Sequence, residues 1–563
     1  MKIFGKYIIP VIAVVVIAIF AIQQLMTQWP EELMTVPEKT GYERTSLHAE
    51  VMDFIVELDS RSDLVHVETV AASAFGKKVP LVVIADPPVM TPGEAESSGK
   101  PVIYLQGNIH GGEVEGKEAL LQLMREIALG DKRALLSDQI LLFAPIYNAD
   151  GNDLFDEQNR SSQHNSPVEV GERASGEGHD LNRDAVKVDA VETKGLINNV
   201  LLRWDPIFLL DMHTTNGSWH GYSLTYASPY TPTAHPAPQG YVFDSMLPEL
   251  QRMVKDDFNL DMFLYGGFST RGEWPPTQWT QGGYSPNAWF VVNYMGLRNR
   301  MAILSETFAH DPFEQRIRSA KAFALSIIRY TNEHGREMED ICRKADEDVI
   351  NSVLQNYGTL EKGVLFGVEP LEEPVDILIY DHEPYTDTVM VRNEETGEEE
   401  QRIRNRFRRL DNKIIVKDVR NVNKFVVTRE QSVPRGYLIP EEFERVAHKL
   451  MEHGIQVSRL DNPVTARGEE FNVERFTQAR ARSFGRMQSR IEGSYRTASK
   501  RFSAGTYIVD LAQPLAFLAF YMLEPEVVDG LVMWDYYNEY LEKQGIDKGP
   551  VPFPVFKYLE IEQ

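Results

Sequence analysis

Between residues 79 and 332, short apolar runs alternate with stretches whose apolar residues recur at helical spacing. This alternation is typical of a mostly parallel mixed sheet with helices on both faces, so we predict an α/β fold for this part of the chain. A helical pattern over residues 29–75 precedes it, and a helical stretch at Arg316–Glu347 closes it. The expected strands are Leu81–Ile84, Val102–Leu105, Ile140–Pro145, Ile207–Asp211 and Ala302–Ser305.

Beyond residue 348 the pattern changes, and we predict a second, α+β domain there. Val375–Tyr380, Lys413–Lys417 and Thr506–Val509 favour strands, and Pro440–Glu452 favours an amphipathic helix. The charged stretch Arg392–Arg409 suggests a solvated hairpin or loop. The predicted division is therefore residues 29–347 and 348–563, and the sequence does not indicate what the second domain does.

The first 28 residues have the pattern of a targeting segment. Lys2 and Lys6 precede a run without charges from Tyr7 to Ile22, and acidic residues follow it. The positive-inside rule then keeps the start of the chain in the cytoplasm and exports the remainder. We expect a signal peptide or a membrane anchor, and either would place the protein in the periplasm or outside the cell.

Charge and cysteine content narrow the classes of function. The formal net charge is −25 and the sequence pI about 5.0, which argues against nucleic acid as a partner because such binding needs basic patches. The single cysteine, Cys342, excludes an intramolecular disulfide and a cysteine-rich metal site. We expect membrane contact only through the N-terminal segment, and the oligomeric state stays open.

The most informative motif is His110-Gly111-Gly112-Glu113, with His213 about a hundred residues later. Each histidine follows an expected strand, at the edge of the sheet where open α/β folds bind ligands. A single His-x-x-Glu is common by chance. However, two imidazoles and one carboxylate form the donor set of a catalytic zinc ion that leaves a coordination position for water. The three residues are therefore candidate ligands of one Zn²⁺ per chain.

Four further features accompany this triad along the chain: Asn148-Ala149-Asp150-Gly151, Asp180-Leu181-Asn182-Arg183, Tyr284 and Glu306. In this order and combination, residues 70–335 resemble the zinc carboxypeptidase family. Ala149 stands where that family usually has proline. The resemblance implies a carboxypeptidase-like α/β fold.

The resemblance also implies a role for each position. His110, Glu113 and His213 would bind zinc, and Asp180 would orient the first histidine. Asn182 and Arg183 would hold the terminal carboxylate of a substrate, a task suited to the planar guanidinium. Glu306 would be the general base. Arg160, or alternatively Arg173, would polarise the scissile carbonyl, and Tyr284, or alternatively Tyr294, would come from a mobile loop over the substrate.

These roles predict a metallocarboxypeptidase that hydrolyses the last bond of a peptide or peptide-like substrate. One alternative is a zinc-dependent deacylase or amidase that acts on a small N-acyl or peptidoglycan-derived substrate. Another is a non-catalytic protein that binds peptide ends. The preference for the C-terminal side chain stays open, because the sequence indicates no residue for the pocket floor.

Overall fold

The computed structural model describes residues 29–562, except residues 162, 164–166, 216–217, 269–273, 393–398 and 547–548. The N-terminal apolar run lies outside these residues, so the predicted signal peptide or anchor stays a prediction. Among the helices in the described part of the chain, none combines the length and apolar character needed to cross a membrane.

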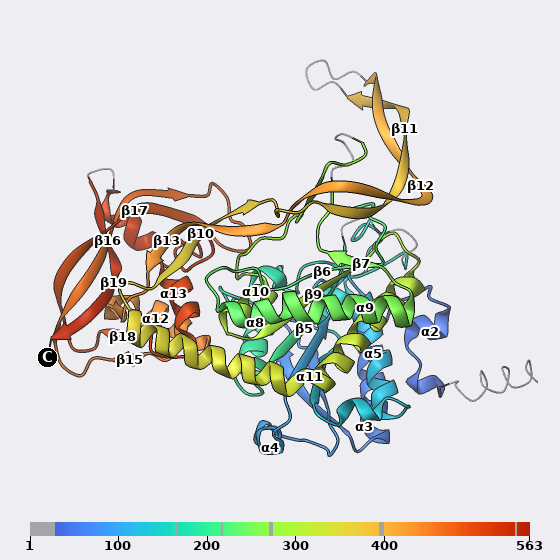
Figure 1. Ribbon diagram of the computed structural model, residues 1–563, viewed down its shortest axis with the longest axis horizontal. Helices are drawn as coiled ribbons and strands as arrows, with labels where there is room; N and C mark the ends of the chain where they lie inside the picture. Colours follow the sequence, from blue (N-terminus) through green and yellow to red (C-terminus); the bar gives the residue numbers. More distant parts are fainter. Residues whose placement is uncertain are drawn as a thin grey trace, which may run out of the picture.

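An eight-stranded mixed sheet forms the centre of the first half of the molecule (Figure 1), in the order β1-β2-β4-β3-β5-β9-β6-β7. Its four central strands, β4, β3, β5 and β9, are parallel, whereas β1, β2 and β6 join antiparallel to a neighbour. All five expected strands are present, which confirms the predicted mixed sheet. The strands are β1 (Val65–Ala72), β2 (Lys78–Ile84), β3 (Val102–Gly107), β4 (Ile140–Ala144), β5 (Phe208–Thr214), β6 (Leu224–Ala227), β7 (Met262–Leu264) and β9 (Met301–Thr307).

Both faces of this sheet are covered. On β3, Ile103 and Leu105 join one buried apolar cluster, while Val102 and Tyr104 join another on the opposite face. This alternation explains why the strand reads as a continuous apolar run. The helices of this half are α2 (Val36–Thr40), α3 (His48–Arg61), α4 (Pro92–Ser98), α5 (Glu115–Ala128), α6 (Ala149–Asp153), α7 (Val191–Gly195), α8 (Pro236–Tyr241), α9 (Leu247–Phe258) and α10 (Val291–Leu297).

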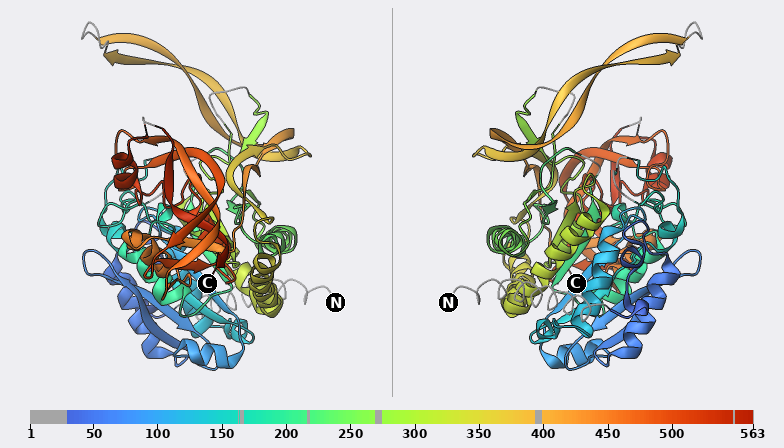
Figure 2. Two further views of the ribbon diagram at one scale, coloured as in Figure 1. Left: turned by 90° about the vertical axis from the view of Figure 1, so that its left-hand side faces the viewer. Right: turned by 90° about the vertical axis from the view of Figure 1, so that its right-hand side faces the viewer.

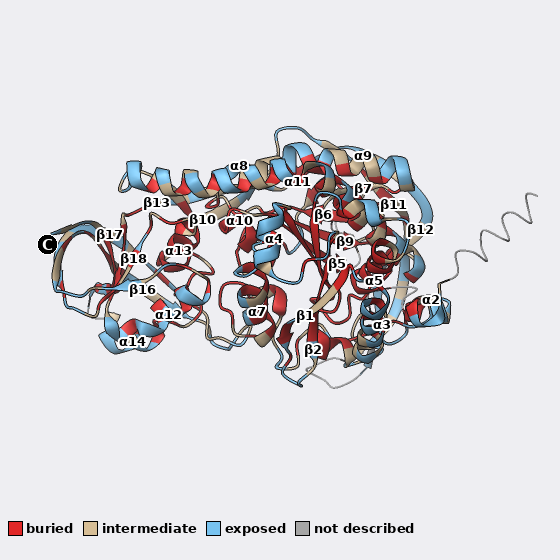
Figure 3. Cartoon of the chain, turned by 90° about the horizontal axis from the view of Figure 1, so that it is seen from below, coloured by how far each residue is buried: buried red, intermediate tan, exposed pale blue. Residues whose placement is uncertain are grey.

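One long helix, α11 (Phe313–Asn356), runs along both halves of the molecule (Figures 1 and 3). At 44 residues it is about 66 Å long. Ile317 and Phe323 pack against the central sheet, whereas Val349 and Val353 join the apolar cluster that includes the C-terminal region. The boundary drawn from the sequence after residue 347 therefore falls inside this helix, because its buried positions continue at helical spacing past that point.

The C-terminal region begins with two antiparallel ribbons. β10 (Glu361–Glu369) pairs with β13 (Lys424–Ser432), and β11 (Val375–Arg392) pairs with β12 (Glu399–Val422). The β11–β12 hairpin projects away from the body of the molecule (Figure 2), and the described part of the charged stretch Arg392–Arg409 lies in it. At its base, β12 pairs with β8 (Gln278–Thr280), a strand from the first half.

A six-stranded antiparallel sheet completes the C-terminal region, in the order β15-β18-β14-β19-β16-β17. Together with the helices beside it, this sheet confirms the predicted second α+β unit. The elements are β14 (Gly436–Ile439), α12 (Glu444–Glu452), β15 (Ser458–Arg459), β16 (Val464–Gln478), β17 (Ser489–Phe502), β18 (Tyr507–Asp510), α13 (Ala516–Leu523), α14 (Asn538–Gln544) and β19 (Val551–Glu562).

Candidate metal centre

The turn after β3 places the side chains of His110 and Glu113 next to each other. Asn108 adopts a left-handed conformation with φ of 63°, which asparagine tolerates better than most residues. Its side-chain amide donates to the carbonyl oxygens of His110, Gly111 and Glu113, at 3.1–3.2 Å. The backbone N–H of Glu113 donates to the carbonyl of His110 at 2.9 Å, which closes the turn just before α5 begins.

The two glycines of this turn are required by close backbone approach. A Cβ atom on Gly111 would lie 2.4 Å from the carbonyl oxygen of Glu172, and one on Gly112 would lie 2.6 Å from that of Gly171. Both distances are far inside van der Waals contact. The loop that follows α6 therefore packs directly over the ligand turn, and only glycine leaves room for it.

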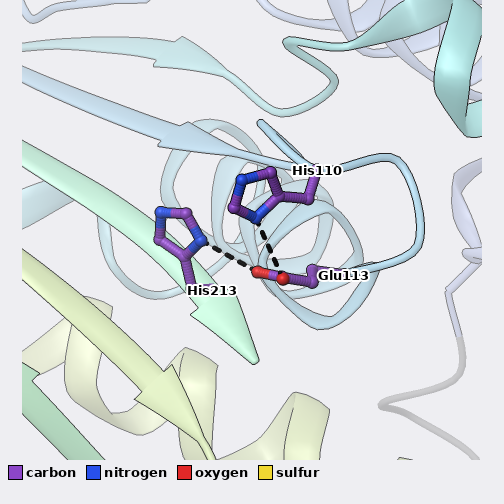
Figure 4. A group of neighbouring side chains, drawn as sticks. All are labelled: His110, Glu113 and His213. Atoms are coloured by element: carbon purple, nitrogen blue, oxygen red, sulfur yellow. Dashed lines mark hydrogen bonds and ion pairs between the residues drawn. The ribbon is translucent and has the colours of Figure 1, made fainter. Parts of the chain in front are cut away.

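His110, Glu113 and His213 meet at the carboxyl ends of β3 and β5 (Figure 4). One donor atom from each lies within 4.8 Å of the other two, and each residue is only 3% exposed. The Nδ1 atoms of His110 and His213 face the two oxygens of Glu113, at 2.9 and 2.8 Å. The structure thus brings the three predicted ligands together around one point.

A carboxylate contacts the Nε2 atom of each histidine ring, so that the Nδ1 atom of each ring points toward Glu113. Nε2 of His110 lies 3.3 Å from Asp180 Oδ1, as expected from the sequence. Nε2 of His213 lies 2.8 Å from Asp211 Oδ2, and Gln106 donates to the other oxygen of Asp211 at 3.0 Å. Such outer partners fix the tautomer and orientation of metal-binding histidines.

Asp211 and Gln106 were not predicted as part of the site from the sequence. The signal for Asp211 was present, because residues two apart on a strand share a face and Asp211 stands two positions before His213. The signal for Gln106 was absent, since its position opposite Asp211 depends on the register between β3 and β5.

Glu306 lies beside the three candidate ligands. Its position on β9 is in parallel register with His213 on β5, so both side chains project from the same face of the sheet. Glu306 is 9% exposed, and among the described residues its Oε2 atom has no hydrogen-bond partner. Burial is the main cause that raises the pKa of Glu306 from 4.5 to about 8; the Glu113 carboxylate acts in the same direction, while His213 and Arg160 act against it. A pKa shifted toward the neutral range lets a carboxyl group exchange a proton there.

The predicted carboxylate-binding pair lies on the next wall of the site. Asn182 Nδ2 is 3.5 Å from His213 Nε2. The guanidinium carbon of Arg183 lies 4.2 Å from the ring centre of Phe290, and its Nη1 donates to the carbonyl of Asn182 at 2.8 Å. Within the described part of the chain, Arg183 has no carboxylate partner, so its remaining donors can bind an anion.

Both arginines that could polarise the scissile carbonyl lie close to Glu113, one of the candidate ligands. Arg160 donates to Glu113 Oε1 at 2.8 Å and to the carbonyls of Thr214 and Thr215 at 2.8 and 3.1 Å. Arg173 donates to Asp180 at 3.0 Å, and its side chain is 40% exposed. Arg160 is thus held by the protein itself, while Arg173 faces the open side, so the choice between them stays a prediction.

Both candidate tyrosines are buried, and the proposed contact of one of them with a substrate stays a prediction. Tyr284 is 5% exposed, and its hydroxyl donates to Asn293 at 3.4 Å. Tyr294 bonds to His453 Nδ1 in the interior, at 2.8 Å. Tyr265, which the sequence analysis missed, lies within the electrostatic range of the site: burial raises its pKa, as do Glu306 and Glu113. The sequence predicted no strand there and tyrosines are abundant in that region, so it carried no signal for Tyr265.

The donor set fits a zinc ion. Two imidazole nitrogens and a carboxylate oxygen converge, a second carboxylate orients each ring, and Glu306 lies beside the three donors. This is the ligand pattern of catalytic zinc sites, in which three protein groups leave one position for water. The described residues therefore contain a candidate metal site, with His110, Glu113 and His213 as its ligands.

Comparison with known proteins gives an independent result. Residues 51–256 match the model of the family described as zinc carboxypeptidase. That stretch includes the three candidate ligands, Asp180, Asn182 and Arg183, and ends before Glu306.

Proteins with similar sequences are also named carboxypeptidases. Carboxypeptidase 2 of Trichophyton equinum is 25% identical over 451 residues, which cover 77% of this chain and 74% of that protein. Carboxypeptidase 2 of Trichophyton rubrum is 25% identical over 450 residues, with the same shares covered. A solved metallo-carboxypeptidase from Burkholderia cenocepacia aligns with a TM-score of 0.38 at 14% identity, over 51% of this chain and 69% of the other. The sequence matches confirm the resemblance: residues 51–256 are similar to the zinc carboxypeptidase family, and this similarity supports metallopeptidase chemistry.

Proposed function

We propose that this protein is a zinc-dependent carboxypeptidase that releases the last residue of a peptide, with Glu306 as the general base. The observation that carries the proposal is the convergence of His110, Glu113 and His213 beside the buried Glu306, whose Oε2 atom has no hydrogen-bond partner among the described residues. The family match supports metallopeptidase chemistry. The bond that is cleaved and the roles of the residues are our inference.

The three ligands would hold one zinc ion per chain. When bound there, zinc supplies a Lewis acid that lowers the pKa of water toward ~7 and polarises a carbonyl group. The contribution of the protein is to present Nδ1 of both rings to the same point, which Asp180 and Asp211 achieve from behind.

Glu306 would remove a proton from the attacking water and deliver it to the leaving amine. Its raised pKa suits both transfers, because the group can accept and return a proton near pH 8. Arg160 or Arg173 would donate hydrogen bonds to the oxygen that becomes negative in the transition state. A donor of this kind contributes about 3–4 kcal/mol in enzymes where one has been removed.

Asn182 and Arg183, which lie beside the candidate ligands, support cleavage at the C-terminal end of a peptide. A guanidinium binds a terminal carboxylate through paired hydrogen bonds, and fixing that end places the last amide bond at a constant distance from the ligands. A chain with an amidated terminus lacks the charge that Arg183 would bind. We also propose that the protein acts outside the cytoplasm, on the basis of the first 28 residues.

The test is Glu306→Gln in the full chain. We expect no detectable release of C-terminal residues from a peptide library by mass spectrometry, while metal analysis still finds one zinc per chain, because the ligands are intact. Glu249→Gln, at an exposed position on α9, is the matched control and should retain full activity. Near-full activity in Glu306→Gln would contradict the role of that residue.

The same library separates the alternatives. Equal hydrolysis of peptides with free and amidated termini would favour the deacylase or amidase. Bound zinc with no turnover by the unaltered protein on any substrate would favour a binding protein.

A further inference from the structure

The side chain of Arg183 is surrounded by aromatic rings, and one of them, Phe484, comes from the C-terminal region. The guanidinium carbon of Arg183 lies 4.2 Å from the ring centre of Phe290, 5.8 Å from Trp289 and 5.9 Å from Phe484. Phe484 belongs to the connection between β16 and β17, in the C-terminal region. Aromatic faces attract a guanidinium and leave its N–H edges directed away from the rings.

The connection that carries Phe484 is tied to the segment that carries Arg183. Arg486 forms a two-point ion pair with Asp189, with distances of 2.9 and 2.6 Å. Two further groups from α12 and the residue after it bond to the same segment. Lys449 Nζ donates to the carbonyl of Val188 at 3.2 Å, and His453 Nε2 lies 3.0 Å from that of Val186.

The loop that carries Trp289 and Phe290 is also held by the C-terminal region. Asp529 accepts the backbone N–H of Trp289 at 2.7 Å, and the hydroxyl of Tyr521 accepts that of Ala288 at 3.3 Å. The Trp289 ring centre lies 6.0 Å from that of Phe484. The C-terminal region therefore supplies one of the three aromatic rings around Arg183 and holds the loop that carries the other two.

The similarity to the relatives is consistent with this arrangement. It covers 77% of this chain, which is more than residues 1–347 can provide, so it continues into the C-terminal region. A part of the chain that only tethered the enzyme would not need to contact both segments at the substrate wall.

We propose that the C-terminal region completes the substrate-binding site, and that Phe484 is a positioning residue that holds the Arg183 guanidinium toward the terminal carboxylate of the substrate. This inference rests on the proposed carboxypeptidase function. It assigns to residues 361–562 a direct part in recognising the substrate end.

The experiment replaces Phe484 by alanine and by tyrosine in the full chain. Because Phe484 acts on binding, we expect Phe484→Ala to raise KM for peptides with a free C-terminus by about three- to tenfold, the size of a partly desolvated cation–π contact, with kcat within about twofold. Phe484→Tyr keeps an aromatic face and should restore KM. Arg475→Ala, which removes an exposed ion pair of the same hairpin with Glu492, should leave both parameters unchanged.

A second readout does not depend on turnover. In the Glu306→Gln background, calorimetry gives the Kd of one short peptide with a free and with an amidated C-terminus. Phe484→Ala should reduce the preference for the free terminus, and the melting temperature should stay within a few degrees, since Phe484 is only partly buried.

The outcomes separate the two proposals. An unaltered KM in Phe484→Ala, an undiminished preference for the free terminus, or a loss of kcat without a change in KM would overturn the positioning role alone. Failure of the unaltered protein to release C-terminal residues would overturn the carboxypeptidase proposal, and this inference with it.

Discussion

At the scale of single residues, two buried polar side chains in a row, Gln106 and Asp211, orient His213, the second candidate histidine ligand. Gln106 on β3 donates to Asp211 on β5, and Asp211 contacts His213 two positions further along the same strand. Asp211 and Gln106 are fully buried, so both bonds form away from water. The imidazole of His213 is thus held with Nδ1 toward Glu113 before any metal binds.

Asp211→Asn tests this arrangement. An amide in place of the carboxylate removes the negative charge behind the ring and allows it to turn, and changes of this kind cost about 10- to 100-fold in metal affinity. Competition with a chelator of known zinc affinity measures the dissociation constant. Asp261→Asn, an exposed acid that pairs with Lys255, should bind zinc as tightly as the unaltered protein. The same affinity in both variants would show that Asp211 does not orient the ligand.

At the scale of elements, a buried ion pair joins the helix after the ligand turn to the long helix. Glu115, in the first turn of α5, accepts a hydrogen bond from Arg316 of α11 at 2.7 Å, and both side chains are fully buried. Glu115 also accepts the hydroxyl hydrogen of Thr214, which follows His213 on β5. The pair therefore connects both ligand-bearing segments to α11.

Arg316→Leu should destabilise the protein by about 3–5 kcal/mol, because it leaves the Glu115 carboxylate buried without its cation. Urea unfolding followed by circular dichroism measures the loss. Arg329→Leu, at another position of α11, removes a partly exposed ion pair with Asp257 of α9 and should cost less than about 1 kcal/mol. Replacing Glu115 and Arg316 together by apolar residues should cost less than Arg316→Leu alone. Equal stability of Arg316→Leu and Arg329→Leu would contradict the structural role of the pair.

At the scale of the whole molecule, an apolar cluster and several buried polar contacts join the two halves. Asp529 is among them, since it is fully buried and accepts the backbone N–H of Trp289 at the substrate wall. Burial raises the pKa of Asp529 from 3.8 to about 7, although the hydrogen bonds from Tyr521 and Trp289 lower it in part. The contact between the halves is therefore sensitive to pH.

The sign of this dependence follows from the direction of the shift. An acid with a higher pKa in the folded state binds its proton more tightly when the protein is folded. The contribution of Asp529 to the free energy of unfolding is therefore complete below about pH 4 and is lost as the pH rises through about 7. Asp529 changes the slope of unfolding free energy against pH by at most about 1.4 kcal/mol per pH unit. Asp529→Asn should show a flatter dependence of unfolding free energy on pH between 4 and 8 than the unaltered protein. Identical slopes would contradict the assignment.

The sequence determined the central sheet and the three ligands because both depend on local pattern. Strands buried on both faces read as apolar runs, and a ligand motif at a strand end keeps its place whatever surrounds it. Asp180 and Glu306 followed from family resemblance, and the structure brings both to the ligands. The choice between Arg160 and Arg173 did not follow, since it depends on the path of the loop over the ligand turn.

Tertiary structure alone decided the remaining features. Gln106 reaches Asp211 only through strand register, Tyr265 lies nearer the site than the sequence indicated, and Phe484 meets Arg183 across three hundred residues. The physical reason is the same in each case: a side chain acts on what is near it in space, and long-range packing sets that distance. Local pattern therefore determined which donors could bind a metal, and packing of the C-terminal region determined the wall a substrate would meet.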